Sequence, residues 1–529
     1  MILFGLAFLV YAVDSRAWPY QRGRDAWDYL VYYLSLFDGD TPFPLVMLVR
    51  TPVTPLVLGL PLQVGGAAAL ELVAAILFAG ATLAWAATAR LFSWPASVIV
   101  AVGLLVQPGF AIPYHEASSD MVTSAGFALL GFVAARSCLA PSTARFAAVG
   151  AVVALLILTR PPNVVLFAAV ALPILASGSW RRRLVWGGAC LAVAAVPVLA
   201  FMVGNDVRYG ELTLSRQRIM HIPFFGAFFS GRMEAEAGPA SRRLAGLIER
   251  DVLSEPAYRR LGVDVSTYLR SPTNLEAIRL LGLVDSVDGR ASDYALLHEA
   301  ALEVDTQRRW FARLGLPINP VRTTRNVWQL LNNRAGHENR IKPAQWPTPE
   351  PTREIDGHLL PNPAALPPPT QAVSYGFLWC ASDEITRCIL EDPRRAYEDP
   401  TLASRYTEVT DRVRELESSL GRGTSNRWLA VQLDRGLRKW PLPSVWLAVA
   451  IVAMIARRPR GWPVLLALLA LALLVLAAHG AAVGSDPNFA LPVVPVTFVA
   501  CACSLLGVRR VDPEREGAVP AVPSPSITP

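Results

Sequence analysis

Charged residues are scarce in this chain of 529 residues, and lysine is almost absent. Asp, Glu, Lys and Arg together make up 17% of the residues, lysine occurs only at Lys342 and Lys439, and hydrophobic residues reach 53%. Because a soluble domain carries about 25% charged residues, this composition excludes an ordinary soluble enzyme. The basic residues are scattered and not clustered on one face, which argues against a nucleic-acid partner.

Cysteine and histidine are also rare, with six of each, and no internal repeat is present. Neither residue type shows the paired spacing of a zinc site. Four cysteines lie in or beside apolar stretches and are interpreted as small packing residues: Cys138, Cys190, Cys501 and Cys503. Cys380 and Cys388 fall in a polar region, where an oxidising compartment would permit a disulfide between them.

Apolar stretches of transmembrane length are abundant, and several approach the roughly 20 residues that cross a bilayer core of about 30 Å. The first stretch is short, and no small-residue cleavage site follows it, so we interpret it as a transmembrane helix whose true start lies upstream of Met1 and not as a signal peptide. About ten spans are predicted: 1–13, 66–91, 94–112, 119–137, 144–160, 162–178, 184–204, 443–457, 461–479 and 489–507.

Arginines predict the orientation of these spans. The connections at 113–118 and 480–488 contain no Lys or Arg. The positive-inside rule then places both chain termini in the cytoplasm and the polar regions 14–65 and 205–441 outside the cell (inner or plasma) membrane. Arginines occupy every second connection: Arg90, Arg136, Arg145, Arg181, Arg182, Arg183, Arg457, Arg458, Arg460, Arg509 and Arg510.

The predicted fold is therefore a mainly α, polytopic membrane protein with a large mixed extracytoplasmic domain inserted between spans 7 and 8. Proline breaks the apolar end of the first outer loop, which is not expected to form one regular spanning helix. The predicted parts are an N-terminal membrane domain (1–204) with its outer loop (14–65), the extracytoplasmic domain (205–441), a C-terminal three-helix membrane segment (442–508) and a disordered cytoplasmic tail (509–529).

Within the extracytoplasmic domain, helical periodicity and proline content separate ordered from extended regions. The stretch from Pro343 to Pro369 is rich in proline and is expected to be extended coil. Helices are predicted around 238–262, 292–314, 321–333 and 402–421.

Ionisable residues gather where the spans meet the outer side. Such residues are costly at membrane depth, so they mark candidate functional sites. Four places share this side, and a common cleft is geometrically feasible. They are RGRDAWDYL (22–30) with Asp25, Asp28 and Tyr29; Arg50; the turn PYHEASSD (113–120) with His115, Glu116 and Asp120; and Arg160 in LTRPPN.

Arginines opposite carboxylates suit the transfer of a sugar from a polyprenyl phosphate. The arginines would bind the phosphate and neutralise charge on the leaving group, while a carboxylate takes the proton of the attacking acceptor hydroxyl. One base is enough because the leaving phosphate needs no general acid, unlike the two-carboxylate site of glycosidases.

Structural interpretations stand beside these functional ones. Asp25 and Asp28 could pair with Arg22 and Arg24 as ordinary loop carboxylates. Asp120 follows two serines at the start of a span, which favours helix capping.

Arg160 could extend toward the interface and remain solvated. His479, near the end of a span, is interpreted as structural.

Taken together, these segments resemble the GT-C superfamily of integral-membrane glycosyltransferases, in the group that includes protein O-mannosyltransferases and lipid A aminoarabinose transferases. RDAWDYLVYYLSL followed by RTPVTPLVLGL is similar to the first-loop pattern of that group. The resemblance nominates Asp25, with Tyr29, as the catalytic base, although Asp28 stays an alternative. YHEASSDMVTSAGFALLGFVAA resembles the stretch with a Glu before the fourth span, which nominates Glu116.

Three later segments extend the resemblance over most of the membrane portion: LTRPPNVVLFAAVALPIL, NDVRYGELTLS and SDPNFALPVVPVTFVA. Asn488 and Phe489 replace the Arg-Tyr usual before the last span, so a phosphate or lipid contact is expected to be missing there. Metal use varies within this family, so a divalent metal stays open as a cofactor, and no ligand cluster decides it.

The leading hypothesis is an inverting transferase that takes a polyprenyl-phosphate-linked sugar from the bilayer to a glycolipid, cell-wall glycan or protein acceptor. Asp25 would be the base and Glu116 a second carboxylate. Arg50, Arg160 and Arg208 would contact the donor phosphate. The alternatives are a lipid-linked glycan polymerase or ligase, a transporter or flippase, and an inactive scaffold. The unequal halves, seven spans against three, argue against transport.

Overall fold

The structure is a computed structural model. It describes residues 2–23, 25–37, 41, 43–215, 224, 226–228, 231–254, 264–269, 280, 294–314, 318–332, 352–355, 358–361, 400–420, 426–482, 489–490 and 493–507.

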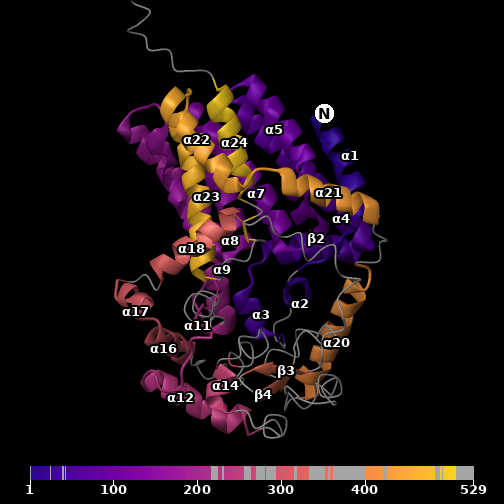
Figure 1. Ribbon diagram of the computed structural model, residues 1–529, viewed down its shortest axis with the longest axis vertical. Coiled ribbons are helices and arrows are strands. Elements are labelled where there is room, and N and C mark those ends of the chain that lie inside the picture. The colour runs from indigo at the N-terminus through magenta and orange to yellow at the C-terminus, as the bar shows by residue number, and fades with distance from the viewer. Residues whose placement is uncertain are drawn as a thin grey trace, which may run out of the picture.

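The described residues are mainly helical, and apolar helices form one upright bundle (Figure 1). Large apolar side chains such as Leu191 and Val196 are exposed on its outside, as expected for a surface that faces lipid. The bundle contains α1 (Ile2–Ala17), α4 (Val53–Arg90), α5 (Trp94–Val106), α7 (Ser119–Leu139), α8 (Thr143–Thr159), η2 (Pro161–Leu175), α9 (Trp180–Tyr209), α22 (Pro443–Arg457), α23 (Trp462–Ala482) and α24 (Pro495–Leu506).

Several of these helices are long and apolar enough to cross a membrane. Among the described residues, five meet that test by length and composition, or six if α5 and the segment Pro108–His115, bent by 75°, form one span. Three further apolar helices are shorter: α8, η2 and α24. The prediction of a multi-pass helical protein is confirmed at this level, while the number of ten spans stays a prediction.

The helix α4 begins earlier than expected. The sequence placed the start of this span at residue 66, but the helix runs from Val53 and contains Pro61. Gly65 and Gly66 leave helical geometry, with φ of −145° and 63°. The proline-broken end of the first outer loop is therefore helical, and the expected irregularity is a kink at the glycine pair, where glycine tolerates a positive φ.

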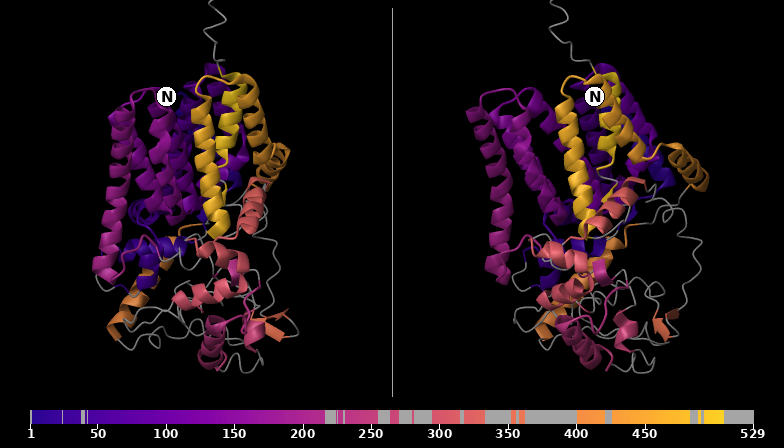
Figure 2. Two further views of the ribbon diagram at one scale, coloured as in Figure 1. Left: turned by 90° about the vertical axis from the view of Figure 1, so that its left-hand side faces the viewer. Right: turned by 60° about the vertical axis from the view of Figure 1, so that its left-hand side comes forward.

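Most elements between α9 and α22 lie beyond one end of the bundle, opposite the N-terminus of α1 (Figures 1 and 2). Those between residues 224 and 304 share an apolar core apart from that of the bundle, which includes Phe224, Phe228 and Leu244. These elements are α11 (Gly226–Phe228), α12 (Pro239–Leu247), η4 (Ile248–Val252), α14 (Val265–Leu269), α16 (Tyr294–Val304), α17 (Thr306–Ala312), β3 (Thr352–Ile355), β4 (His358–Pro361) and α20 (Pro400–Glu417). Helix α18 (Pro320–Asn332) crosses the end of the bundle, and α21 (Arg427–Lys439) lies along the side of the bundle (Figure 1).

Two of these elements differ from expectation. The strands β3 and β4 pair antiparallel, with Thr352 opposite Pro361, inside the stretch that was predicted to be extended coil. The dipeptide Asp356–Gly357 between them is a strong hairpin signal in the sequence. The helix α21, which was not predicted, packs against α1 and α6 (Pro108–Ala111).

A short strand pair brings the first outer loop onto the turn before α7. Strand β1 (Gln21–Arg22) pairs parallel with β2 (Glu116–Ala117), with Gln21 opposite Glu116. Gly23 then passes so close to Ala117 that a Cβ on Gly23 would lie 2.6 Å from the Ala117 carbonyl oxygen. Only glycine permits this approach without a shift. The loop continues into α2 (Ala26–Ser35) and α3 (Pro44–Val49).

The contact between α8 and α9 depends on Gly150. A Cβ at this position would overlap the backbone carbonyl oxygen of Cys190. Gly150→Ala is expected to destabilise the bundle by about 1–3 kcal/mol, because a backbone atom cannot move aside as a side chain can. Thermal unfolding of the detergent-purified protein measures this effect.

Gly204→Ala on α9 is the matched control, since a Cβ there meets no atom within 4 Å. An unchanged melting temperature for Gly150→Ala would contradict the packing of α8 on α9.

Candidate active site

Arg50 joins the two carboxylates of the first outer loop. It follows α3, and its Nε donates to Asp28 Oδ2 at 3.1 Å. Its Nη2 contacts the same Asp28 oxygen, and its Nη1 lies 3.2 Å from Asp25 Oδ2. The guanidinium also lies over the Tyr29 ring, 5.2 Å from the ring centroid, in a cation–π contact. One arginine therefore holds three side chains of the RDAWDY segment.

The two aspartates differ in exposure and backbone conformation. The Asp25 side chain is 28% exposed, whereas that of Asp28 is 2% exposed. Asp25 precedes α2 with φ 61° and ψ 12°, in the left-handed region, and its side chain does not cap the helix. Aspartate tolerates this region better than most residues, but the conformation still has a cost and is concentrated at functional sites. Asp25 is therefore the more accessible carboxylate.

Arg160 forms a second, more deeply buried group. It ends α8, is 7% exposed, and donates from Nη2 to Asp120 Oδ1 and from Nε to Ser119 Oγ, both at 2.6 Å. Its guanidinium lies 5.4 Å from the centroid of the Phe489 ring. Within the described residues its Nη1 is buried without a hydrogen-bond partner. The interpretation that Arg160 extends into solvent is therefore wrong.

The capping role expected for Asp120 belongs to Ser118. The Ser118 hydroxyl accepts from the backbone N–H of Asp120 at 3.2 Å. Asp120 is thus free of the capping role and pairs with Arg160, which lies 40 residues further along the chain.

Tyr29 connects the two groups. Its hydroxyl donates to Ser119 Oγ at 2.9 Å, and Ser119 also accepts from Arg160. The ring of Tyr29 lies under Arg50. The structure thus brings the RDAWDY segment, Arg50, the 113–120 turn and Arg160 together, while their position on the outer side of the membrane stays a prediction.

Glu116 and His115 occupy different surroundings. Glu116 is half-buried in β2 and lies opposite Gln21 in the strand pair. Its backbone is therefore held by the chain segment that precedes Asp25. His115 is fully buried and stacks on Tyr11, with ring centroids 4.5 Å apart, and contacts Trp18 edge-on at 6.0 Å. His115 is therefore part of an aromatic cluster under the site.

Arg208 holds the far end of α2. Its Nη1 donates to the Leu36 carbonyl at 2.9 Å and its Nη2 to the Ser35 carbonyl at 3.3 Å. A cation at a helix C-terminus satisfies unpaired carbonyls and complements the helix dipole. This contact makes Arg208 a support for α2, and its role as a phosphate ligand stays a prediction.

A further carboxylate, Glu417, is not among the residues that the sequence singles out. It ends α20, and its Oε1 lies 3.0 Å from Arg22 Nε. Burial raises the pKa of Glu417; Arg22 opposes this shift and the charge of Asp28 adds to it. Arg22 therefore pairs with Glu417, and the pairing with Asp25 and Asp28 that the structural interpretation assigned to it goes to Arg50.

No sequence spacing signals Glu417, because almost 400 residues separate it from Arg22. Glu71 lies inside a predicted span, and a glutamate at that depth is itself a signal in the sequence. Its charge acts on Tyr11 and Tyr20, beside the aromatic cluster.

Other expectations have mixed outcomes. His479 is buried with Nδ1 2.9 Å from the Val475 carbonyl oxygen and is structural, as expected. Cys380, Cys388 and Asn488 lie outside the described residues. In the part of the chain that the structure describes, no group of three or more His, Cys, Asp or Glu side chains could hold a metal ion.

Comparisons with known proteins give one structural neighbour. No protein-family model and no curated protein matches the chain. The crystal structure of ArnT from Cupriavidus metallidurans in the apo state is similar over 96% of this chain and 77% of that chain, with 14% sequence identity and a TM-score of 0.32. A superposition this loose carries no conclusion about activity, so the site is interpreted from its own geometry.

The buried Glu417 generates a pH-dependent prediction. When folding raises the pKa of a carboxyl group, the protein loses stability as the pH rises above the ordinary pKa of that group, here 4.5. Glu417→Gln is therefore expected to melt at a higher temperature than the wild type at neutral pH. The difference should shrink toward zero as the pH falls to that value, because the protonated side chain resembles glutamine.

Glu415→Gln, at an exposed position on the same helix, should show no such pH dependence. A Glu417→Gln protein that is less stable than the wild type at neutral pH would show that the ion pair with Arg22 outweighs burial.

Proposed function

We propose that this protein is a membrane glycosyltransferase that moves a sugar from a polyprenyl-phosphate-linked donor to an acceptor at the outer face of the cell membrane, with inversion at the anomeric carbon. The observation that carries the proposal is the contact of Arg50 Nη1 with the accessible Asp25, 3.2 Å away, beside the ends of apolar helices. A base and a cation at this position suit a donor that is held in the bilayer by its lipid.

Asp25 is the proposed base. Its side chain is the more exposed of the two aspartates, so an acceptor hydroxyl can reach it. Asp28 is enclosed under Arg50 and would fix the guanidinium. This division of roles favours Asp25 over Asp28, a choice that the sequence alone left open.

Arg50 and Arg160 are the proposed phosphate ligands. A guanidinium has five N–H donors, and the described contacts of Arg50 with the two aspartates involve three of its nitrogens. The Arg50 guanidinium lies beside the accessible carboxylate of Asp25, so its charge is at the point where a donor phosphate would bind. Arg160 offers its buried Nη1. Charged donors fixed in a buried site stabilise the charge that develops on a leaving phosphate.

The proposed reaction is one displacement. The acceptor hydroxyl oxygen attacks the anomeric carbon while its proton passes to an Asp25 carboxylate oxygen. The bond between the anomeric carbon and the phosphate oxygen breaks, and its electron pair leaves with the polyprenyl phosphate. Glu116, in the adjacent strand, would orient the acceptor. The acceptor is a glycolipid, a cell-wall glycan or a protein.

Asp25→Asn tests the base directly. The amide keeps the size of the side chain but cannot take a proton, so turnover should fall by about a hundredfold or more with an unchanged melting temperature. Donor consumption is followed by mass spectrometry for purified protein with a panel of polyprenyl-phosphate and polyprenyl-diphosphate sugars and acceptor-containing membranes.

Two variants complete this experiment. Asp28→Asn removes the buried negative charge that pairs with Arg50 and should also destabilise the protein, by about 3–5 kcal/mol. Asp206→Asn, at an exposed position in α9, is the control and should behave as the wild type. Full activity of Asp25→Asn, or consumption of no donor by the wild type, would contradict the proposal.

A further inference from the structure

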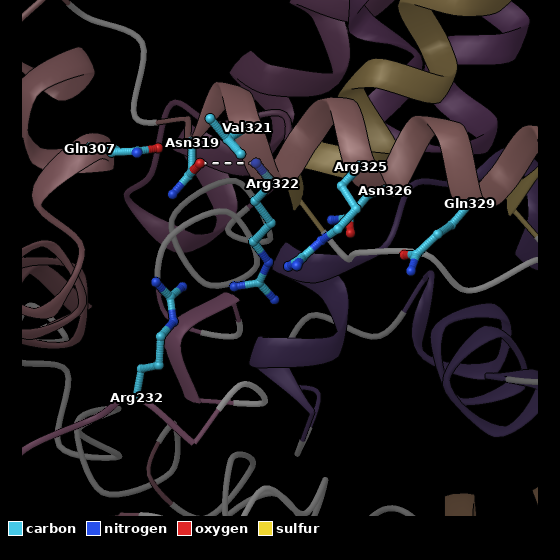
Figure 3. A pocket seen from close by; sticks show the side chains of 8 residues that line it. All are labelled: Arg232, Gln307, Asn319, Val321, Arg322, Arg325, Asn326 and Gln329. Atoms are coloured by element: carbon cyan, nitrogen blue, oxygen red, sulfur yellow. Dashed lines mark hydrogen bonds between the residues drawn. The ribbon is translucent and has the colours of Figure 1, made fainter.

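A polar cavity of about 470 Å³ lies where the polar elements meet the bundle, apart from the Asp25 site. Figure 3 shows Arg322 and Arg325 reaching down from α18 while Arg232 rises from the loop that follows α11. Gln307 and Gln329 lie on its two sides. The described lining residues thus provide three guanidinium groups. None of the described lining residues is an aspartate or a glutamate.

The nearest described carboxylate is already engaged. Asp305 lies 3.3 Å from Arg232 Nη2, accepts from Asn319 Nδ2 at 3.2 Å and caps α17 through the Arg308 backbone N–H at 3.0 Å. Its hydrogen-bonding capacity is therefore directed to the protein itself. Arg322 Nη1 also donates to the Gly226 carbonyl, so a ligand would meet guanidinium groups that the protein already holds in place.

A fourth arginine, Arg308, does not line the cavity but lies close enough for its charge to act on Arg232 and Arg322. Arg308 is 2% exposed, and within the described residues its Nη1 has no hydrogen-bond partner. Burial lowers the pKa of Arg308 to about 10; Asp305 opposes this shift, while the charges of Arg322 and Arg232 add to it. Burial and the neighbouring Arg232 also lower the pKa of Arg322. Mutual repulsion of this kind is relieved when an anion binds among the guanidinium groups.

The cavity lies at the level of the outer ends of the membrane helices. On α18, Asn326 Nδ2 donates to the Gly480 carbonyl of α23 at 2.7 Å. Asn332 Oδ1 accepts from the Ser444 hydroxyl of α22 at 2.6 Å. Helix α18 therefore crosses the ends of both helices, where phosphate groups of lipid would be found.

We infer that the cavity lined by Arg232, Arg322 and Arg325 is a second anion site that binds a phosphate group. Guanidinium groups bind phosphate oxygens through paired N–H donors, and the flanking glutamines can bind neighbouring hydroxyl groups. The phosphate belongs either to a lipid headgroup or to a soluble phosphate ester. This inference does not depend on the transferase proposal, and its test needs no sugar donor.

The test uses full-length protein in nanodiscs and two probes. In the first arm, nanodiscs contain only phosphatidylcholine, and binding of glycerol 3-phosphate is measured by isothermal calorimetry. In the second arm, phosphatidic acid is added to the nanodisc lipid, and lipid retained by the protein is counted by native mass spectrometry. The variant is Arg325→Gln, because Arg325 is exposed and its loss should not disturb folding.

Arg313→Gln, at an exposed arginine just after α17 that does not line the cavity, is the matched control. The wild type and Arg313→Gln should bind in at least one arm, with affinity that falls as salt is raised, and Arg325→Gln should bind about tenfold or more weakly. Binding in the first arm identifies a soluble phosphate, and binding only in the second identifies a headgroup. Equal binding by Arg325→Gln and the wild type, or no binding in either arm, would overturn the inference.

Discussion

The pairing of Arg50 with Asp25 and Asp28 is the interaction on which the rest of the site depends. A charge removed from water must be paired, because an isolated buried ion is strongly unfavourable. Arg50 meets this requirement with one buried carboxylate and one accessible carboxylate. The same arrangement that stabilises the guanidinium therefore leaves a carboxylate at the surface of the site. In the proposed mechanism, the same cation would also bind the donor phosphate.

Three other contacts hold this pairing in place. Gly23 lets the first outer loop lie directly on Ala117, Arg208 secures the C-terminal end of α2, and Tyr29 ties its first turn to Ser119. Helix α2 is thus fixed at both ends and along the chain segment before it. A site assembled from short elements near a membrane surface needs such supports, because loops alone position side chains poorly.

The sequence predicted which helices and charged residues build the site better than it predicted which residues pair with one another. Hydropathy located the apolar helices, and the cost of charge at membrane depth singled out Asp25, Arg50 and Arg160, because both signals are local. The partner of each charge depends on tertiary packing, which spacing does not encode. Arg22 was matched with its neighbours in sequence but pairs with Glu417.

The helical and extended expectations failed for related reasons. Pro61 lies inside α4 without ending it, and the irregularity falls at Gly65 and Gly66, one turn further along the helix. The sequence of α21 is rich in polar residues and therefore does not predict a helix, which is held in the structure by packing on α1. The sequence between β3 and β4 contains an Asp-Gly pair that favours a hairpin. The high proline content of the surrounding stretch nevertheless favoured extended coil in the prediction.

The most direct test of the account is the anomeric configuration of the first product, measured by NMR within the first turnovers with a donor of defined configuration. A single displacement with Asp25 as the base and no covalent intermediate predicts complete inversion. A retained configuration would require a nucleophilic carboxylate or a second displacement and would contradict the proposed role of Asp25.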